Sequence, residues 1–149
     1  MRSCCLFFFV MIYSCSVTAQ HLEGYWEGKM YRKDKSEDTV LVQMNIKLNN
    51  KKNYTGTALC RFANGDHAET ILQIIENKNT GKVKITELDI ISTSLSAETI
   101  LFLDRYFLVE KTPGQLMGVV KCYTYVKKAN YPSLPCHPDM YIELTKAFD

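Results

Sequence analysis

The stretch that decides the fold reads Leu22-Glu23-Gly24-Tyr25-Trp26-Glu27-Gly28-Lys29-Met30-Tyr31, and it holds the single Trp of a 149-residue chain. Every second residue from Leu22 to Met30 is apolar or Gly, and this period of two predicts a half-buried strand. Trp26 falls on the apolar face, where a large buried ring fills a narrow space. We therefore interpret this stretch as the first strand of a small closed antiparallel barrel, with Trp26 plugging one end.

A secretory signal peptide precedes this strand. A short basic start at Met1-Arg2-Ser3 leads into an apolar run from Cys4 to Tyr13 and then into Val17-Thr18-Ala19, which fits the small-x-small cleavage rule. The apolar run is too short for a membrane span. We expect residues 1–19 to be removed and residues 20–149 to form one exported barrel domain, secreted or periplasmic.

A second interpretation of the leader uses Cys15. The sequence Ile12-Tyr13-Ser14-Cys15 loosely resembles a bacterial lipoprotein signal, although Tyr13 is bulkier than the usual pattern. In that case the protein would be anchored to a membrane through a lipid on Cys15.

Alternation continues downstream and is clearest from Val40 to Leu48, where five apolar side chains fall on one face. Turn signals such as Asn64-Gly65 and Pro113-Gly114 separate further segments of this kind. The further strands that we expect are Tyr54–Phe62, His67–Glu76, Lys82–Ile91, Thr99–Lys111, Gln115–Val126 and Asp139–Lys146. About eight strands at regular spacing predict an all-β fold, a sandwich or a barrel. Glycines inside these strands suit strong curvature and favour a single antiparallel up-and-down barrel: Gly24, Gly28, Gly56 and Gly118.

Charge argues against nucleic acid as a partner. The chain has 18 Lys and Arg residues against 16 Asp and Glu, and the loss of Arg2 with the leader leaves one excess positive charge. A nucleic-acid binder needs a strongly basic surface to meet phosphates. No apolar run after the leader is long enough for a transmembrane helix.

The motif Gly24-Tyr25-Trp26 at the head of the first strand resembles the calycin group of lipocalins, avidins and fatty-acid-binding proteins. The layout is also similar to small uncharacterised exported barrels of bacteria, which begin with Leu-x-Gly-x-Trp-x-Gly and end with Cys and Pro before a final apolar strand. The residues from Leu22 to Gly28, Pro135-Cys136-His137-Pro138 and Tyr141 to Leu144 echo both ends. The resemblance implies an eight-stranded barrel whose narrow end is closed by Trp26.

The chain departs from the lipocalin pattern in several places. The nearest match to the later Thr-Asp-Tyr motif is Leu103-Asp104-Arg105-Tyr106, a poor one. Lipocalins stack an Arg of the last strand on the Trp, and here only Lys146 or Lys121 could substitute. We expect no lipocalin-like C-terminal helix after the last strand, and a single Trp argues against the biotin site of avidins.

The expected function is non-catalytic binding of a small, partly apolar ligand, since an eight-stranded barrel has room for side chains or for one small ligand. The candidate lining residues are Trp26, Met30, Met44, Phe102 and Tyr106. Two alternatives stay open: a side-chain-filled barrel that acts through its loops as an inhibitor or interaction protein, and an enzyme of calycin shape.

No catalytic residues, metal ligands or cofactor are expected. The chain lacks Gly-x-Ser-x-Gly, His-Glu-x-x-His and a phosphate-binding loop. The carboxylates Glu87, Asp89, Asp104 and Glu110 lie in expected strands, and we expect them on the solvated face. His137 is expected at the surface, because its neighbours do not repeat a known zinc-ligand spacing.

Three cysteines remain after cleavage, enough for one disulfide and one thiol. We expect Cys122 to pair with Cys136, which would pin the Pro-rich segment from Lys127 to Pro138, and Cys60 to be a buried thiol. The rival pairing of Cys60 with Cys136 resembles the lipocalin habit of tying the C-terminal segment to an earlier strand.

Overall fold

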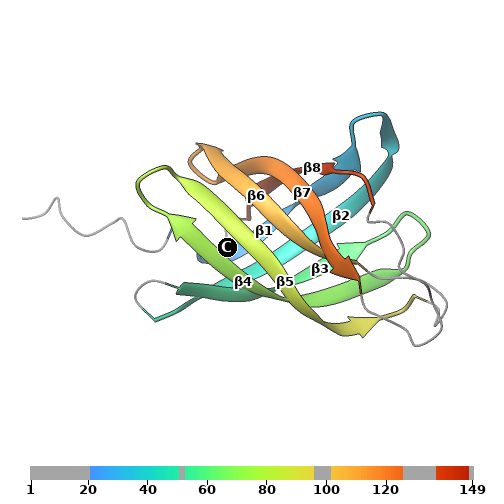
Figure 1. Ribbon diagram of the computed structural model, residues 1–149, viewed down its shortest axis with the longest axis horizontal. Helices are drawn as coiled ribbons and strands as arrows, with labels where there is room; N and C mark the ends of the chain where they lie inside the picture. Colours follow the sequence, from blue (N-terminus) through green and yellow to red (C-terminus); the bar gives the residue numbers. More distant parts are fainter. Residues whose placement is uncertain (1–20, 51–52, 96–101, 126–136, 148–149) are drawn as a thin grey trace, which may run out of the picture.

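The chain forms a closed barrel of eight antiparallel strands (Figure 1) in a computed structural model that describes residues 21–50, 53–95, 102–125 and 137–147. The strands follow one another around the barrel in chain order, and β8 closes it by pairing with β1. Their bounds are β1 Gly24–Arg32, β2 Lys35–Asn49, β3 Asn53–Arg61, β4 His67–Asn77, β5 Lys82–Thr93, β6 Phe102–Thr112, β7 Gln115–Tyr125 and β8 Met140–Lys146. The all-β up-and-down barrel expected from the sequence is confirmed.

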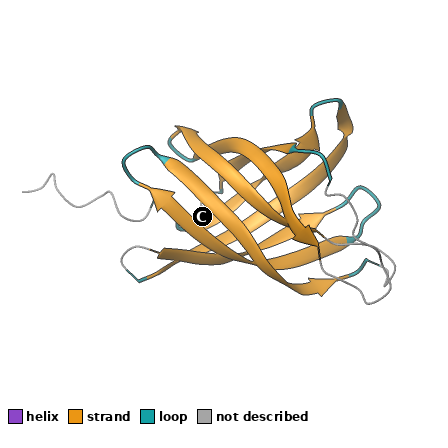
Figure 2. Ribbon diagram, viewed as in Figure 1, coloured by secondary structure: helices purple, strands orange, loops and turns teal. Residues whose placement is uncertain are grey.

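Strands and the loops between them make up the described part of the molecule (Figure 2). Within these ranges we find no helical segment with the length and apolar character that a membrane crossing requires. The leader and most of the Pro-rich segment lie outside the described residues, so signal cleavage stays a prediction.

The period of two sets the inside and the outside of the barrel. Trp26 pairs with Met44 on β2 and with Lys146 on β8, and the inward side chains of each strand form one continuous core. The alternation from Val40 to Leu48 appears as buried or half-buried side chains at every second position. The hydrophobic pattern therefore fixes the register, because a slip of one residue would turn the whole apolar face outward.

The backbones of neighbouring strands approach each other closely at Gly118. A Cβ built on Gly118 would collide with the carbonyl oxygen of Phe107 on the neighbouring strand β6. A side chain at this position would push β6 and β7 apart, which explains a Gly inside a strand.

The loop at Asn64-Gly65 is wider than the two-residue hairpin that the dipeptide suggests. β3 ends at Arg61 and β4 begins at His67, and the amide of Phe62 donates to the carbonyl oxygen of Asp66 across 2.9 Å. Gly65 alone of this pair has a positive φ, of 89°. Asn64 instead uses its side chain, whose Oδ1 accepts from the amide of Asp66.

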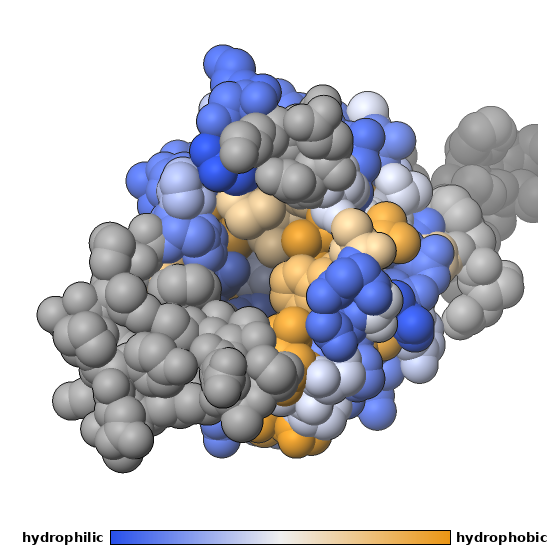
Figure 3. All heavy atoms as spheres, turned by 90° about the vertical axis from the view of Figure 1, so that its right-hand side faces the viewer, coloured by the Kyte–Doolittle hydropathy of each residue, from blue (hydrophilic) through white to orange (hydrophobic). Residues whose placement is uncertain are grey.

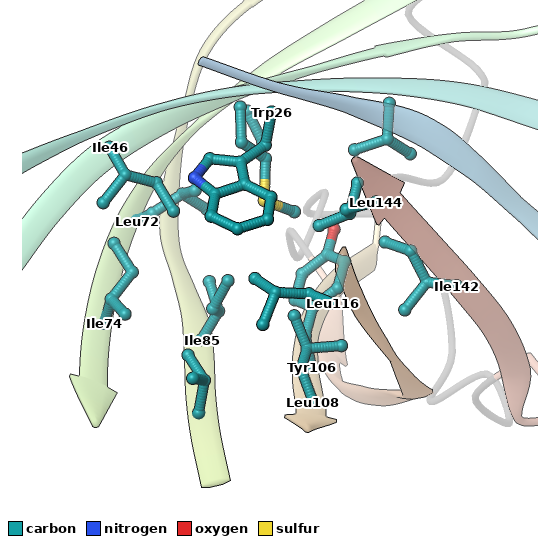
Figure 4. Close-up of a cluster of buried hydrophobic side chains, with 14 of the residues drawn as sticks. Trp26, Ile46, Leu72, Ile74, Ile85, Tyr106, Leu108, Leu116, Ile142 and Leu144 are labelled. Carbon is teal, nitrogen blue, oxygen red and sulfur yellow. The ribbon is translucent and has the colours of Figure 1, made fainter. Parts of the chain in front are cut away.

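Trp26 closes one end of the barrel, as expected. Its side chain is completely buried, and Figure 4 shows its ring among Ile46, Leu72 and Leu144. The indole Nε1 donates to the carbonyl oxygen of Leu22 over 2.8 Å, which satisfies its one polar atom. The Nζ of Lys146 on β8 lies 5.8 Å from the centroid of the Trp26 ring. Of the two candidates, Lys146 and Lys121, it is therefore Lys146 that stands where lipocalins stack an Arg on the Trp. We call this the closed end.

Candidate functional site

A cavity of about 470 Å³ opens at the other end of the barrel, which we call the open end. Figure 3 looks into this end and shows hydrophobic residues around a hollow, with hydrophilic residues on either side of it. Its lining residues are Met30, Val40, Cys60, Phe62, Ala63, Asn64, Ala68, Thr70, Glu87, Leu95, Asp104, His137 and Met140. The volume falls in the range that small-molecule sites occupy.

Strand direction brings these residues together. In an up-and-down barrel, odd strands end where even strands begin, so Met30 at the end of β1 lies at the same height as Val40 near the start of β2. The same rule joins Cys60 near the end of β3 to Ala68 at the start of β4. The described side chains at this end leave the cavity open between them.

Glu87 is the most unusual lining residue, because it is a carboxylate only 4% exposed. Its Oε1 accepts hydrogen bonds from the Tyr106 hydroxyl over 2.7 Å and from the Thr70 hydroxyl over 3.1 Å. Its Oε2 accepts from the backbone amide of Asp104 over 2.9 Å. Three donors from β4 and β6 thus hold this carboxyl group where the cavity meets the core.

Burial raises the pKa of Glu87 to about 7, because the ionised form loses its hydration. The hydrogen bond from Tyr106 opposes this shift, and the negative charge of Asp104 adds to it. Burial also raises the pKa of Tyr106 well above its ordinary value, with the charge of Glu87 adding to the shift, so its hydroxyl keeps its proton and donates. Glu87 can therefore gain or lose a proton near neutral pH.

Asp104 and His137 form an ion pair beside Glu87. His137 Nε2 lies 2.8 Å from Asp104 Oδ1, and Nδ1 lies 2.7 Å from the carbonyl oxygen of Pro138. Both ring nitrogens face acceptors, which suits the imidazolium, because only that form donates from both. The hydrogen bond to Asp104 raises the pKa of His137 despite partial burial, which opposes the shift.

Cys122 lies near this pair, with its sulfur, an Asp104 oxygen and a His137 nitrogen all within 4.8 Å of one another. The sulfur of Cys122 already has a partner of its own. A carboxylate and an imidazole remain, which is fewer than the three or four ligands of a zinc site. We do not assign a metal to this cluster.

The structure distributes the residues expected to bind a ligand over different depths. Met30 lines the cavity, whereas Trp26, Met44 and Tyr106 are completely buried in the core below it. Tyr106 reaches the cavity indirectly, through its hydrogen bond to Glu87. Phe102 begins β6, and its side chain is outside the described part of the structure.

Two expectations about polar residues are wrong. Glu87 and Asp104 point into the barrel and not to the solvated face, and His137 is half-buried against Asp104. Asp89 and Glu110 are exposed as expected.

The pattern that would have found these carboxylates is present in the sequence. Glu87 continues the inward series of Val83 and Ile85, and Asp104 precedes Tyr106 and Leu108 on their face. Residue type alone placed both carboxylates outside, whereas the period of their strands places them inside.

Comparison with known proteins shows similarity in fold alone. No protein-family model matches the chain, and no curated protein matches its sequence. The barrel is similar to several solved structures of designed barrels. One is described as "De novo design of a fluorescence-activating beta barrel", with a TM-score of 0.56 and 11% identity over 87% of this chain and 96% of that one. "Structure of EF1p2_mFAP2b bound to DFHBI" gives a TM-score of 0.62 with 15% identity over 87% and 96% of the two chains. "Structure of a redesigned beta barrel, mFAP1, bound to DFHBI" gives 0.56 with 13% identity over 89% and 100%.

Proposed function

We propose that the protein is an exported, non-catalytic barrel that binds one small, partly apolar ligand in the cavity at its open end. The observation that carries this proposal is the cavity itself, with its volume of about 470 Å³ and its apolar walls from Met30, Val40, Phe62 and Met140. Sites for small molecules are concave and mostly apolar, with a few polar groups that fix orientation. Glu87, Asp104 and His137 are the charged groups among the described lining residues, and Thr70 and Asn64 are further polar ones.

The cavity also supports this proposal over a side-chain-filled barrel that works through its loops. The closed end around Trp26 is packed as a filled barrel would be, whereas the described residues of the open end leave a cavity between them. Two of the similar designed barrels are described as bound to the small molecule DFHBI, so a barrel of this form has room for a ligand.

We also propose that the chain is a member of the calycin group. This membership is supported by the closed eight-stranded barrel, by Gly24-Tyr25-Trp26 at the start of β1, and by Lys146 over the Trp26 ring. We further propose that residues 1–19 are a signal peptide and that the mature chain begins near Gln20. Intact mass of the protein from its own host tests this, and a mass that fits a lipidated N-terminal Cys15 would replace it with the anchored form.

Binding is tested with N-phenyl-1-naphthylamine, a dye that is uncharged at neutral pH and brightens in apolar surroundings. We expect the purified protein to bind it at one site. Ala68→Phe places a ring in the cavity and should remove most of this binding, because Ala68 lines the cavity. Ile71→Phe is the matched control, since Ile71 lies on the same strand and is exposed on the outer face.

The outcome that contradicts the proposal is dye binding that is absent, or that Ala68→Phe and Ile71→Phe change equally. Native mass spectrometry of protein taken from its own host is the complementary measurement. A small molecule that stays bound to the wild type through purification, and that is absent from Ala68→Phe, would identify the ligand.

An enzyme is the second candidate, and Glu87 is the observation that favours it. A carboxyl group with a pKa of about 7 in a cavity has the properties of a general acid or base. We favour binding because Tyr106, Thr70 and the Asp104 amide all direct their hydrogens at Glu87, which holds the carboxyl group in place. A ligand recovered chemically altered by the wild type and unaltered by Glu87→Gln would favour the enzyme.

A further inference from the structure

We propose that the ligand is a small apolar molecule with a protonated amine, and that its ammonium group binds to Glu87 where the cavity meets the core. This inference rests on the proposed ligand-binding function and names the chemical class of the ligand. It follows from the charges that line the cavity, from the environment of Glu87 and from the apolar walls.

The charges of the described lining residues do not balance. Glu87, Asp104 and His137 are the charged side chains among them, and the described lining contains neither Lys nor Arg. Asp104 and the His137 imidazolium neutralise each other at 2.8 Å. Ionised Glu87 is then left as one negative charge without a counter-ion among the described lining residues.

The hydrogen bonds that Glu87 accepts leave its carboxylate able to accept one more, from an ammonium group. A carboxylate offers about four acceptor positions. Oε1 accepts two hydrogen bonds, from Tyr106 and Thr70, and Oε2 accepts one, from the Asp104 amide. An ammonium group donates in three directions and carries the positive charge that this site lacks.

Protonation of Glu87 explains how the carboxyl group tolerates burial when the cavity holds no ligand. Burial favours the neutral acid, and the pKa of about 7 leaves both forms accessible near neutral pH. A bound cation stabilises the ionised form, so binding of an amine should release a proton from Glu87.

The apolar walls of the cavity favour an apolar body for the rest of the ligand. Met30, Val40, Phe62 and Met140 offer apolar surface, and Met side chains adapt to varied shapes. A ligand with a carboxylate in place of the amine would bring a second negative charge next to Glu87 and close to Asp104. Like charges in such surroundings oppose binding, so fatty acids should be rejected.

Three probes of equal chain length test the ligand class: n-octylamine, 1-octanol and octanoate. Each is titrated against protein loaded with N-phenyl-1-naphthylamine near pH 8, where the alkylamine is still protonated. We expect n-octylamine to displace the dye about tenfold more tightly than 1-octanol, which is the gain expected from one charge-assisted hydrogen bond. Octanoate should bind most weakly.

Glu87→Gln removes the charge and keeps the shape, so it should bring n-octylamine to within about threefold of 1-octanol. Asp89→Asn is the matched control. It removes a carboxylate from the same strand, but one that is exposed outside the cavity, and it should leave the preference for the amine intact.

The pH dependence provides a second test that does not depend on a variant. Lowering the pH from about 8 to about 5.5 protonates Glu87, so n-octylamine should lose about tenfold in affinity while 1-octanol changes little. The titratable groups that face Glu87 are Tyr106 and Asp104 on β6, Cys60 on β3 and His137 before β8. Dependence on pH that persists in Glu87→Gln belongs to the His137–Asp104 pair and would overturn the assignment to Glu87.

The failures of the two proposals are distinguishable. If the dye binds and Ala68→Phe removes it, but n-octylamine binds no better than 1-octanol, the ligand class is wrong and the binding function stands. If octanoate displaces the dye best, the inference is overturned outright. If neither the dye nor 1-octanol binds, both proposals are wrong.

Discussion

Trp26 links the N-terminal segment to the core through two contacts that few residues can supply together. Its ring packs among buried side chains, and its Nε1 donates to the Leu22 carbonyl. Truncation would remove the packing and leave that carbonyl without its donor.

We therefore expect Trp26→Ala to reduce the free energy of unfolding by about 3–5 kcal/mol, the usual loss for an aromatic core residue. Urea unfolding followed by circular dichroism measures it. Tyr25→Ala is the control, because Tyr25 is 54% exposed on the outer face and its truncation should matter far less. Equal losses in the two variants would contradict a plug at Trp26.

Glu87 should make the protein less stable as the pH rises. Its pKa is 4.5 in an ordinary setting and about 7 in the folded chain, so between these values the folded state holds more protons than the unfolded state. The contribution of Glu87 to stability then falls with increasing pH across this window and is constant on either side of it. The total loss is on the order of 3 kcal/mol.

The free energy of unfolding from about pH 4 to about pH 8 checks this sign, and Glu87→Gln should remove the decline between about pH 4.5 and about pH 7. His137 contributes with the same sign at higher pH. Its pKa is raised in the fold, so its stabilisation is complete below the ordinary value and is lost as the pH rises through the raised one. Stability that increases with pH in the wild type but not in Glu87→Gln would contradict the buried carboxyl group.

At the scale of elements, β6 and β7 show why a strand in this barrel needs Gly. The Gly118 Cα faces the backbone of β6 so closely that a Cβ would meet the Phe107 carbonyl oxygen. Backbone atoms cannot move aside as a side-chain end can, so the strands would have to separate.

We expect Gly118→Ala to lower the free energy of unfolding by about 2 kcal/mol or more, within the range for overpacking a well-packed site. Gly65→Ala is the comparison, because Gly65 has a positive φ but open space around it. Its cost should be that of the left-handed conformation alone, about 1 kcal/mol. Thermal melts of both variants decide this, and a smaller loss for Gly118→Ala would mean that the two strands separate easily.

The segment that leads into β8 carries the cysteine prediction. Cys60 is a buried free thiol, as expected from its place in the alternation of β3, and burial raises its pKa far above the ordinary value. Cys122 is not a free thiol, whereas Cys136 lies outside the described residues. The pairing of Cys122 with Cys136 therefore stays a prediction.

Peptide mapping without reduction tests this pairing in protein from the oxidising compartment. We expect Cys122 and Cys136 to be recovered joined, with Cys60 alkylated only after unfolding. Closing a loop of this length is worth about 3 kcal/mol in the chain-entropy model, so reduction should lower the melting temperature. Recovery of Cys60 joined to either partner would refute it.

At the scale of the whole molecule, the sequence predicted the barrel because its signals are local. Alternation between turn signals predicted eight strands in an up-and-down barrel, and the pairing of each strand with the next one in the chain confirms it. The cavity was not predictable in the same way. It depends on how the side chains of seven strands fill a shared space, and neither period nor spacing measures that volume.

The polar groups of the site were hidden for a different reason. A carboxylate is rarely buried, so composition places Glu87 outside while the period of β5 places it inside. Where residue type and period disagree, the structure follows the period and supplies hydrogen bonds, here from Tyr106 and Thr70. Such a disagreement is where a functional site is expected.

The closed end of the barrel holds the packed core that stabilises the fold, and the open end holds the proposed binding cavity. This separation leads to a last prediction. Leu116 at the start of β7 is completely buried in the core shared with Trp26, and it does not line the cavity. Leu116→Ala should therefore lower the free energy of unfolding by about 2–5 kcal/mol and leave the dye affinity of the folded protein unchanged. Ala68→Phe should have the opposite profile, because its ring enters open space at the cavity and displaces the ligand more than it strains the core. Urea unfolding and dye titration of both variants, at a temperature where each is folded, measure the two quantities side by side. Loss of dye binding in folded Leu116→Ala would mean that the ends are coupled through the barrel, and that the cavity depends on the plug at the other end.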